Sequence, residues 1–190
     1  MDALSDFAFY ETGLVQTPIP ANNHIEPFLE AGIPNLWTYY CISQYKQVSQ
    51  RFVCMPSMRN RVIGLQLFKY DIKGFLHWGY NFYNSQYSTQ AINPFRFLDG
   101  LHWSPAGDTF LVYPGPDGPL ASLRMKVFFE AIQDLRALKL LASFVGQDAV
   151  MQLVEAELPK PLTFSDYPHD TQWLLDVRKR VNDALRSHCS

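Results

Sequence analysis

Aromatic and hydrogen-bonding side chains follow directly on a short apolar segment in the middle of the chain. Gly74-Phe75-Leu76 is typical of a buried strand, and His77-Trp78-Gly79-Tyr80-Asn81 comes next. A strand that ends in Trp, Tyr and Asn can floor a pocket for a flat, hydroxylated ligand such as a sugar ring, because these side chains combine an apolar face with a polar edge. The same residues could instead form the rim of a hydrophobic core, and composition does not decide between the two.

Alternation along the strands selects the side chains that would line a common cleft. Every second residue of a strand points to one side, which groups Trp78 with Tyr80 and places Tyr40 at the end of the segment 36–41. We therefore expect Tyr40, Trp78, Tyr80 and Asn81 to bind the substrate.

The sequence Asn22-Asn23-His24 follows an extended Pro18-Ile19-Pro20 segment and would lie at the rim of the same pocket. Asn22 and His24 therefore complete the predicted substrate-binding set. The alternative interpretation is that Asn23 only caps the helix that follows.

Other site chemistries find little support in the residue pattern. The histidines share no zinc-like spacing, so we expect no metal site and no cofactor. The segment 113–118 is a cluster of turn residues that lacks the Lys-Ser/Thr of a phosphate-binding loop. No Gly-x-Ser-x-Gly sequence and no Cys-His pairing suggest a covalent hydrolase.

The overall composition is that of one globular domain with a real core. The 190 residues are 47% hydrophobic and 15% aromatic, and the net charge is −2. Such a charge does not attract nucleic acid, and no apolar stretch is long enough to span a membrane, so we expect neither partner.

Cys41 and Cys54 lie in apolar surroundings, and with Cys189 they make an odd number. We therefore expect buried free thiols, which are typical of a reducing compartment, and hence a cytoplasmic location.

Short apolar segments alternate with helical ones along the chain. Strands are predicted over residues 2–5, 16–20, 36–41 and 74–80. Helices are predicted over 7–15, 24–31, 56–71, from Ser122 as N-cap to the stop at Gly146, over 147–158, and from Asp170 or Thr171 onward. This alternation implies parallel strands joined by crossover helices.

About four parallel strands followed by C-terminal helices correspond to half of a (β/α)8 barrel, in which sites lie at the C-terminal ends of the strands. An open α/β layer of four or five strands is the structural alternative. We expect residues 1–158 to form the half-barrel and residues 159–190 to form a proline-containing loop and a terminal helix packed on the same domain.

The chain also resembles the C-terminal half of the bacterial domain of unknown function 4091, which is related to family 123 of the glycoside hydrolases. The resemblance runs over residues 2–158, and its most specific part is Lys73–Asn81 together with Gly107–Gly118. The family implies a (β/α)8 barrel that hydrolyses a β-linked N-acetylhexosamine, with the acetamido group of the substrate as nucleophile.

One departure from the family pattern bears on catalysis. The family uses an adjacent Asp-Glu pair on an earlier strand, and residues 1–190 contain no adjacent Asp-Glu or Glu-Asp. Asp71, Asp99 and Asp108 do not occupy that motif. We therefore expect no catalytic residue in this chain, which would be a truncated product, a mis-started gene or a fragment. It supplies the substrate pocket, or it is a silent half-barrel that binds carbohydrate or a partner subunit.

An open half-barrel has consequences for assembly. It leaves unpaired edge strands and an uncovered apolar interior, both of which favour association with another chain. We expect a homodimer that covers the faces carrying Leu4, Ile19, Leu36 and Leu76, unless the terminal helices cover them.

Overall fold

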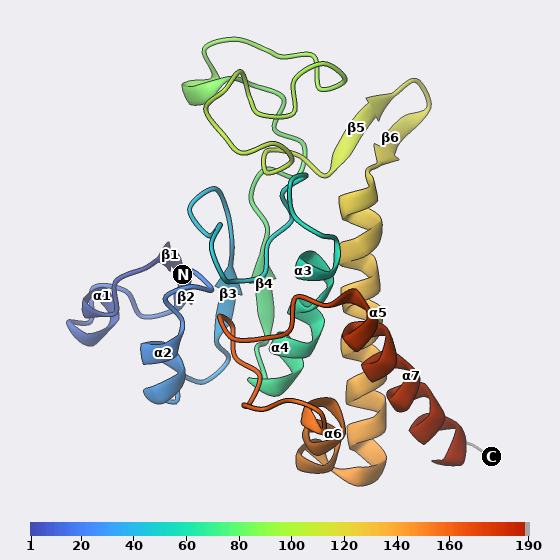
Figure 1. Cartoon of the computed structure of the whole chain (residues 1–190). Helices are drawn as coiled ribbons and strands as arrows, with labels where there is room; N and C mark the ends of the chain where they lie inside the picture. The colour runs from blue at the N-terminus through green and yellow to red at the C-terminus, as the bar shows by residue number, and fades with distance from the viewer. Residues whose placement is uncertain (189–190) are drawn as a thin grey trace.

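The computed structural model describes residues 1–188, in which short parallel strands lie beside helices (Figure 1). The strands are β1 (Asp2–Leu4), β2 (Pro18–Pro20), β3 (Trp37–Tyr39), β4 (Gly74–Leu76), β5 (Val112–Gly115) and β6 (Gly118–Ala121). The helices are α1 (Ala8–Glu11), α2 (Glu26–Glu30), α3 (Met58–Arg61), α4 (Ile63–Lys69), α5 (Leu123–Val145), α6 (Gln147–Glu155) and α7 (Thr171–His188). One 3-10 helix, η1, covers Gln86–Ser88.

The four expected parallel strands are present as two pairs. β1 pairs with β2 and β3 with β4, both in parallel, and a parallel bridge between Ala21 and Tyr39 joins the two pairs. The α/β class and the C-terminal helices are thus confirmed. Within residues 1–188 the strands form small sheets and no closed barrel, so the partial (β/α)8 barrel stays a proposal.

The strand predicted over 74–80 ends early. β4 stops at Leu76, and Gly79 has a φ of 59°, which interrupts extended geometry. A Cβ at Gly79 would lie 2.8 Å from the carbonyl oxygen of Thr109, so the backbone here packs closely against the returning chain. Strand alternation therefore does not apply to Trp78 and Tyr80.

Residues 77–121 form a long insertion between β4 and α5 (Figure 1). The turn cluster predicted over 113–118 lies in the antiparallel hairpin of β5 and β6, with Gly115 opposite Gly118. These two strands were not predicted, because their glycines and prolines are poor strand formers and only tertiary context favours them.

The C-terminal helices follow the sequence signals closely. The Ser122 hydroxyl accepts a hydrogen bond from the backbone N–H of Met125 at the start of α5, and Gly146, with a φ of 85°, ends it. The predicted helix 56–71 is instead divided at Val62 into α3 and α4.

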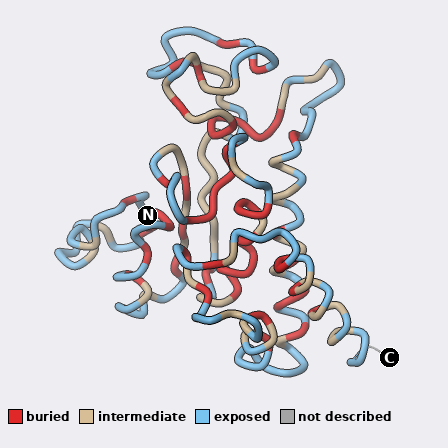
Figure 2. The backbone as a smooth tube through the Cα atoms, in the orientation of Figure 1, coloured by how far each residue is buried: buried red, intermediate tan, exposed pale blue. Residues whose placement is uncertain are grey.

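Helix α5 is the common packing partner of the other helices. It lies against α3, α4, α6 and α7. A Cβ at Gly64 in α4 would lie 2.1 Å from the carbonyl oxygen of Ala131 in α5, so these two helices approach too closely for any side chain. The red segments in Figure 2 follow these contacts through the centre of the molecule.

The chain itself covers most of the faces that a dimer was expected to cover. Leu4, Ile19 and Leu36 are buried, and Leu4 and Leu36 share a hydrophobic cluster with residues of α2, α4 and α5. The expectation that a second copy covers these three residues is therefore wrong. Leu76 is only half-buried.

A buried carboxylate fixes the position of α5. Asp134 accepts hydrogen bonds from Arg61 Nε at 2.6 Å and Nη2 at 2.9 Å, and from Arg178 Nη1 at 2.8 Å. It therefore joins α5 to α3 and α7. The segment after α6 also packs inward, since Leu162 and Phe164 are buried. The predicted division of the chain at residue 158 stays a prediction.

The two described cysteines are less buried than expected. Cys41 and Cys54 are free thiols, as predicted, and Cys41 is half-buried. Cys54 is exposed, so the expectation that it is buried is wrong, because it lies in the irregular loop before α3. Cys189 lies outside the described residues.

Candidate functional site

A buried ion pair lies beyond the ends of β3 and β4. Arg51 Nη2 is 3.1 Å from Asp108 Oδ1 and donates a hydrogen bond of 2.7 Å to the Asp108 carbonyl oxygen. Both side chains are completely buried. Arg51 belongs to the segment that follows β3, and Asp108 to the insertion that follows β4. The pair therefore connects two segments that both start at the C-terminal ends of strands.

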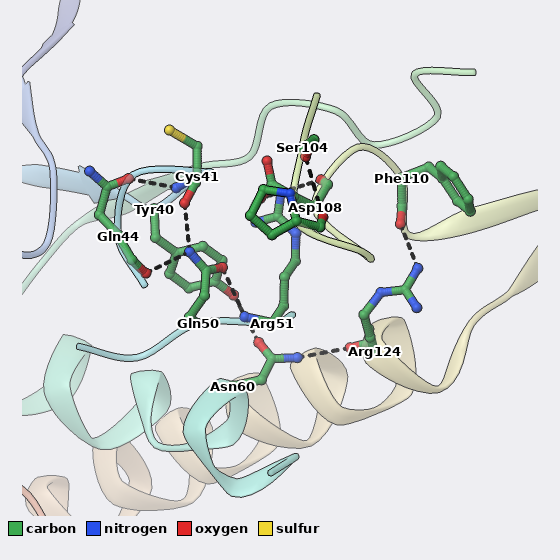
Figure 3. Close-up of polar contacts among 11 residues, drawn as sticks. Tyr40, Cys41, Gln44, Gln50, Arg51, Asn60, Ser104, Asp108, Phe110 and Arg124 are labelled. Carbon is green, nitrogen blue, oxygen red and sulfur yellow. Dashed lines mark hydrogen bonds and ion pairs between the residues drawn. The ribbon is translucent and has the colours of Figure 1, made fainter. Parts of the chain in front are cut away.

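Tyr40 completes the β3 side of this site (Figure 3). Its ring lies 5.1 Å from the Arg51 guanidinium carbon, and its hydroxyl donates a hydrogen bond of 2.8 Å to Asn60 Oδ1. The backbone around Arg51 is fixed as well, because its N–H donates to Gln50 Oε1 at 2.8 Å. We call Tyr40, Arg51, His77, Trp78 and Asp108 the strand-end cluster.

Many polar atoms of the cluster and its neighbour Thr109 have no hydrogen-bond partner within residues 1–188. They are Arg51 Nε and Nη1, both ring nitrogens of His77, Trp78 Nε1, Asp108 Oδ2 and Thr109 Oγ1, while Asp108 Oδ1 has only its ion pair with Arg51. A buried polar atom without a partner costs about 1–3 kcal/mol, and folded proteins contain few of them. A concentration of such donors and acceptors at one place is typical of a site that hydrogen-bonds a polar ligand.

Burial controls the charge states in the cluster. It raises the pKa of Asp108 to about 6, although the positive charge of Arg51 acts in the opposite direction. The indole of Trp78 also lowers this pKa, without reaching hydrogen-bond geometry. Burial and the Arg51 charge lower the pKa of His77 to about 3. At neutral pH the site therefore combines a charged Arg51–Asp108 pair with a neutral imidazole.

Aromatic rings form one side of the site. The Trp78 ring centroid lies 6.0 Å from that of Trp103 and 5.9 Å from that of Phe82, and both pairs are tilted. His77 lies edge-on to Tyr80 at 6.2 Å. Tyr80 is 45% exposed, so its ring is open to a ligand.

The structure separates the six residues expected to bind substrate. Trp78 is half-buried beside Asp108, while Tyr80 and Asn81 are exposed, Tyr80 at a bend and Asn81 in an antiparallel bridge with Phe110. Tyr40 is fully buried, and its ring contacts the Arg51 guanidinium from behind. Asn22 is also buried, and its Nδ2 donates to the Ser49 carbonyl oxygen at 3.0 Å. His24 is exposed at the start of the α2 turn.

The sequence did not point to the ion pair that organises the site. No pattern in the sequence distinguishes Arg51 from the other arginines, and Asp108 lies outside the Asp-Glu motif that the resemblance implies. The available signals were weak: an arginine directly before Phe52-Val53, and an aspartate in the run Gly107-Asp108-Thr109. A charged residue inside an otherwise apolar segment indicates a buried partner, but it does not identify that partner.

Arg51 also lines a cleft of about 190 Å³ between the loop before α3 and the start of α5. Asn60 and Arg124 lie in its walls, and none of the six expected substrate-binding residues does.

Two kinds of feature are absent from residues 1–188. None of their helices is both long enough and apolar enough to cross a membrane. No three side chains among their His, Cys, Asp and Glu residues are grouped so that they could hold a metal ion.

Comparison with known families gives one match. The description "Glycoside hydrolase 123, catalytic domain" applies to residues 1–141, which run from β1 into α5 and contain the whole strand-end cluster. A comparison with curated proteins gives no match. Because the family match covers well over half of the chain, this protein belongs to the glycoside hydrolase 123 catalytic-domain family.

Proposed function

We propose that the chain binds a β-linked N-acetylhexosamine at the strand-end cluster. The observation that carries the proposal is the set of buried, unpaired polar atoms on Arg51, Trp78 and Asp108, which lies within the segment that matches the glycoside hydrolase family. A sugar offers hydroxyl groups that both donate and accept hydrogen bonds, so it can satisfy guanidinium and indole N–H groups together with carboxylate oxygens.

The aromatic side chains support the same ligand class. The indole of Trp78 and the exposed ring of Tyr80 provide apolar faces on which a pyranose ring can stack. We propose that these two side chains and Asn81 contact the sugar directly. Tyr40 acts behind them, by holding the Arg51 guanidinium against its ring. Asn22 and His24 remain proposed contacts at the rim of the site.

The proposed role of this chain in the reaction is substrate binding. The resemblance implies that the acetamido group acts as nucleophile and that an adjacent Asp-Glu pair orients it, and this sequence has no such pair. A positioned general acid contributes roughly 10²–10⁴-fold to the rate. We therefore expect the 190-residue chain alone not to hydrolyse 4-nitrophenyl N-acetyl-β-hexosaminides above background. Turnover that a substitution within this chain abolishes would contradict this part of the proposal.

The relation to domain 4091, the C-terminal half of a (β/α)8 barrel and the cytoplasmic location also stand as proposals. Four parallel strands in sequential order support the half-barrel, and the free thiols Cys41 and Cys54 support a reducing compartment.

The alternative function is a non-catalytic half-barrel that pairs with a second copy of itself. Its support is a row of exposed apolar residues along α5, with Leu123 73% and Phe129 52% exposed, and the edge of β4 that no strand of residues 1–188 pairs. A homodimer would give twice the 21.9 kDa of one chain in light scattering at micromolar concentration. A single 21.9 kDa species would exclude it.

The direct test of the proposed ligand compares two sugars that differ in one group. Isothermal titration calorimetry should detect binding of methyl N-acetyl-β-hexosaminides in the gluco or galacto series. The matching methyl β-hexosides, which lack the acetamido group, should bind at least about tenfold more weakly, since roughly one hydrogen bond to a charged group is lost. Equal affinity for both would contradict recognition of an amino sugar, and no binding of either would contradict the site.

A further inference from the structure

The cleft beside Arg51 has a mainly apolar lining, in which the charged groups are all of one sign. Its charged residues are Arg51 and Arg124, and no acidic residue lines it. Arg124 lies in the first turn of the 23-residue helix α5, where the helix dipole adds partial positive charge. The volume of about 190 Å³ is below the roughly 300–1,000 Å³ of sites that enclose a whole drug-sized ligand. The cleft therefore suits a single small group.

The two amide side chains of the cleft are already hydrogen-bonded within the protein, and Ser57 is its remaining neutral polar residue. Asn60 donates from Nδ2 to the Arg124 carbonyl oxygen at 3.1 Å and accepts the Tyr40 hydroxyl. Gln50 donates to two carbonyl oxygens and accepts from the Arg51 backbone N–H. These contacts, drawn in Figure 3, leave the amide groups little capacity for a ligand.

The guanidinium groups, in contrast, keep donors available. Arg51 Nε and Nη1 and Arg124 Nε are buried and have no acceptor within residues 1–188. The Arg51 side chain is completely buried. Figure 3 shows both arginine side chains rising from the level of Asn60, one toward Asp108 and the other toward Phe110. These guanidinium donors therefore lack an acceptor.

The charges are not balanced either. Asp108 pairs with Arg51, while the acceptor of the Arg124 guanidinium is a neutral group, the Phe110 carbonyl oxygen at 2.8 Å. No carboxylate of residues 1–188 forms an ion pair with Arg124. Burial lowers the pKa of Arg124, Tyr113 acts in the opposite direction, and the neighbouring Arg51 charge lowers the pKa further. A buried cation is stabilised by an anion that accepts its hydrogen bonds.

We propose that this cleft binds an anionic oxygen group, a sulfate or a carboxylate, through the Arg124 guanidinium, with the charge of the buried Arg51 adding to the positive potential. The group is either a free small anion or the acidic substituent of a carbohydrate. In the second case the inference rests on the proposed function, and the cleft selects sugars that carry a negative charge next to the ring bound at the strand-end cluster.

Titration calorimetry of sodium sulfate at constant ionic strength, balanced with chloride, tests the site. Arg124→Gln should weaken sulfate binding roughly tenfold or more, because it removes a charge-assisted donor. Arg124→Lys, which keeps the charge, should retain part of the affinity. The matched control is Arg136→Gln, an exposed arginine of the same helix, which should bind as the wild type does. Circular dichroism melting checks that each variant is folded.

Two further ligands distinguish the sources of the anion. Glucuronate that binds where sulfate and acetate do not assigns the cleft to an acidic sugar, whereas sulfate binding alone assigns it to a free anion. Trp78→Phe should weaken binding of the neutral N-acetylhexosaminide without changing sulfate binding, so failure of one proposal is visible separately from failure of the other. The anion site is overturned if neither sulfate nor glucuronate binds the wild type, or if Arg124→Gln binds them equally well.

Discussion

Asp108 Oδ1 lies 3.1 Å from Arg51 Nη2, with both side chains completely buried, and this pair joins the segment after β3 to the insertion after β4. Removing one partner of a buried ion pair leaves an uncompensated charge in a medium of low polarity. The pair therefore fixes the two loops at the strand ends, and it is also the polar part of the proposed sugar site.

The first prediction concerns the pH dependence of stability. Burial raises the pKa of folded Asp108 from 3.8 to about 6, so the free energy of unfolding falls as the pH rises from about 4 to 6. The pKa of folded His77 is lowered from 6.5 to about 3, so the free energy of unfolding rises over the same interval. The two effects oppose each other in the wild type.

Each variant should reveal the effect of the other group. Asp108→Asn should make stability rise more steeply with pH, and His77→Gln should make it fall, in each case by at most about 1.4 kcal/mol per pH unit. Urea unfolding at several pH values between 4 and 7 measures these slopes. Asp117→Asn, at the exposed hairpin turn, is the control and should keep the slope of the wild type. Identical slopes in all four proteins would refute the assignment.

The second prediction compares two acidic residues of α5 that lie near Arg61. Asp134 is buried and accepts hydrogen bonds from both Arg61 and Arg178. Glu130 is exposed, and its carboxylate makes a longer contact of 3.9 Å with Arg61. Asp134→Ala should lower the free energy of unfolding by about 3–5 kcal/mol, and Glu130→Ala by less than about 1 kcal/mol. Chemical denaturation measures both. Similar losses for the two variants would mean that burial of Asp134 does not determine its importance.

The third prediction concerns the contact of α4 with α5. A methyl group at Gly64 would lie 2.1 Å from the Ala131 carbonyl oxygen, so Gly64→Ala must separate the helices and should cost about 3 kcal/mol or more. Gly146→Ala has free space around the new methyl group and meets only the strain of its backbone (φ 85°, ψ 156°), at about 1–3 kcal/mol. Thermal melting of both variants gives the comparison, and an unchanged melting temperature for Gly64→Ala would contradict the close approach.

The sequence predicted the elements whose signals are local. Apolar segments bounded by proline gave the positions of the parallel strands, and the Ser122 cap and Gly146 set the limits of α5. The helix predicted over 56–71 lies at the right position, but it is divided at Val62 into two helices. These features depend on residues a few positions apart, which a sequence displays directly.

The site depends on contacts between distant residues and was predicted only in part. Trp78 and Tyr80 were found because aromatic residues directly follow a strand. Arg51 and Asp108 are 57 positions apart, and no periodicity or spacing relates them. Gly79, with its positive φ, turns the chain after β4. The directions in which the following side chains point could therefore not be derived from strand alternation.

The most direct test of the sugar site compares the substitution of two tryptophans by phenylalanine. Trp78 and Trp173 both carry a buried indole N–H without an acceptor in residues 1–188, but Trp173 belongs to α7 and lies in the helical core. Calorimetric titration with methyl N-acetyl-β-hexosaminide should show that Trp78→Phe weakens binding about tenfold, the effect of one lost hydrogen bond, while Trp173→Phe binds as the wild type does. Equal affinities of Trp78→Phe and the wild type would contradict binding at the strand-end cluster.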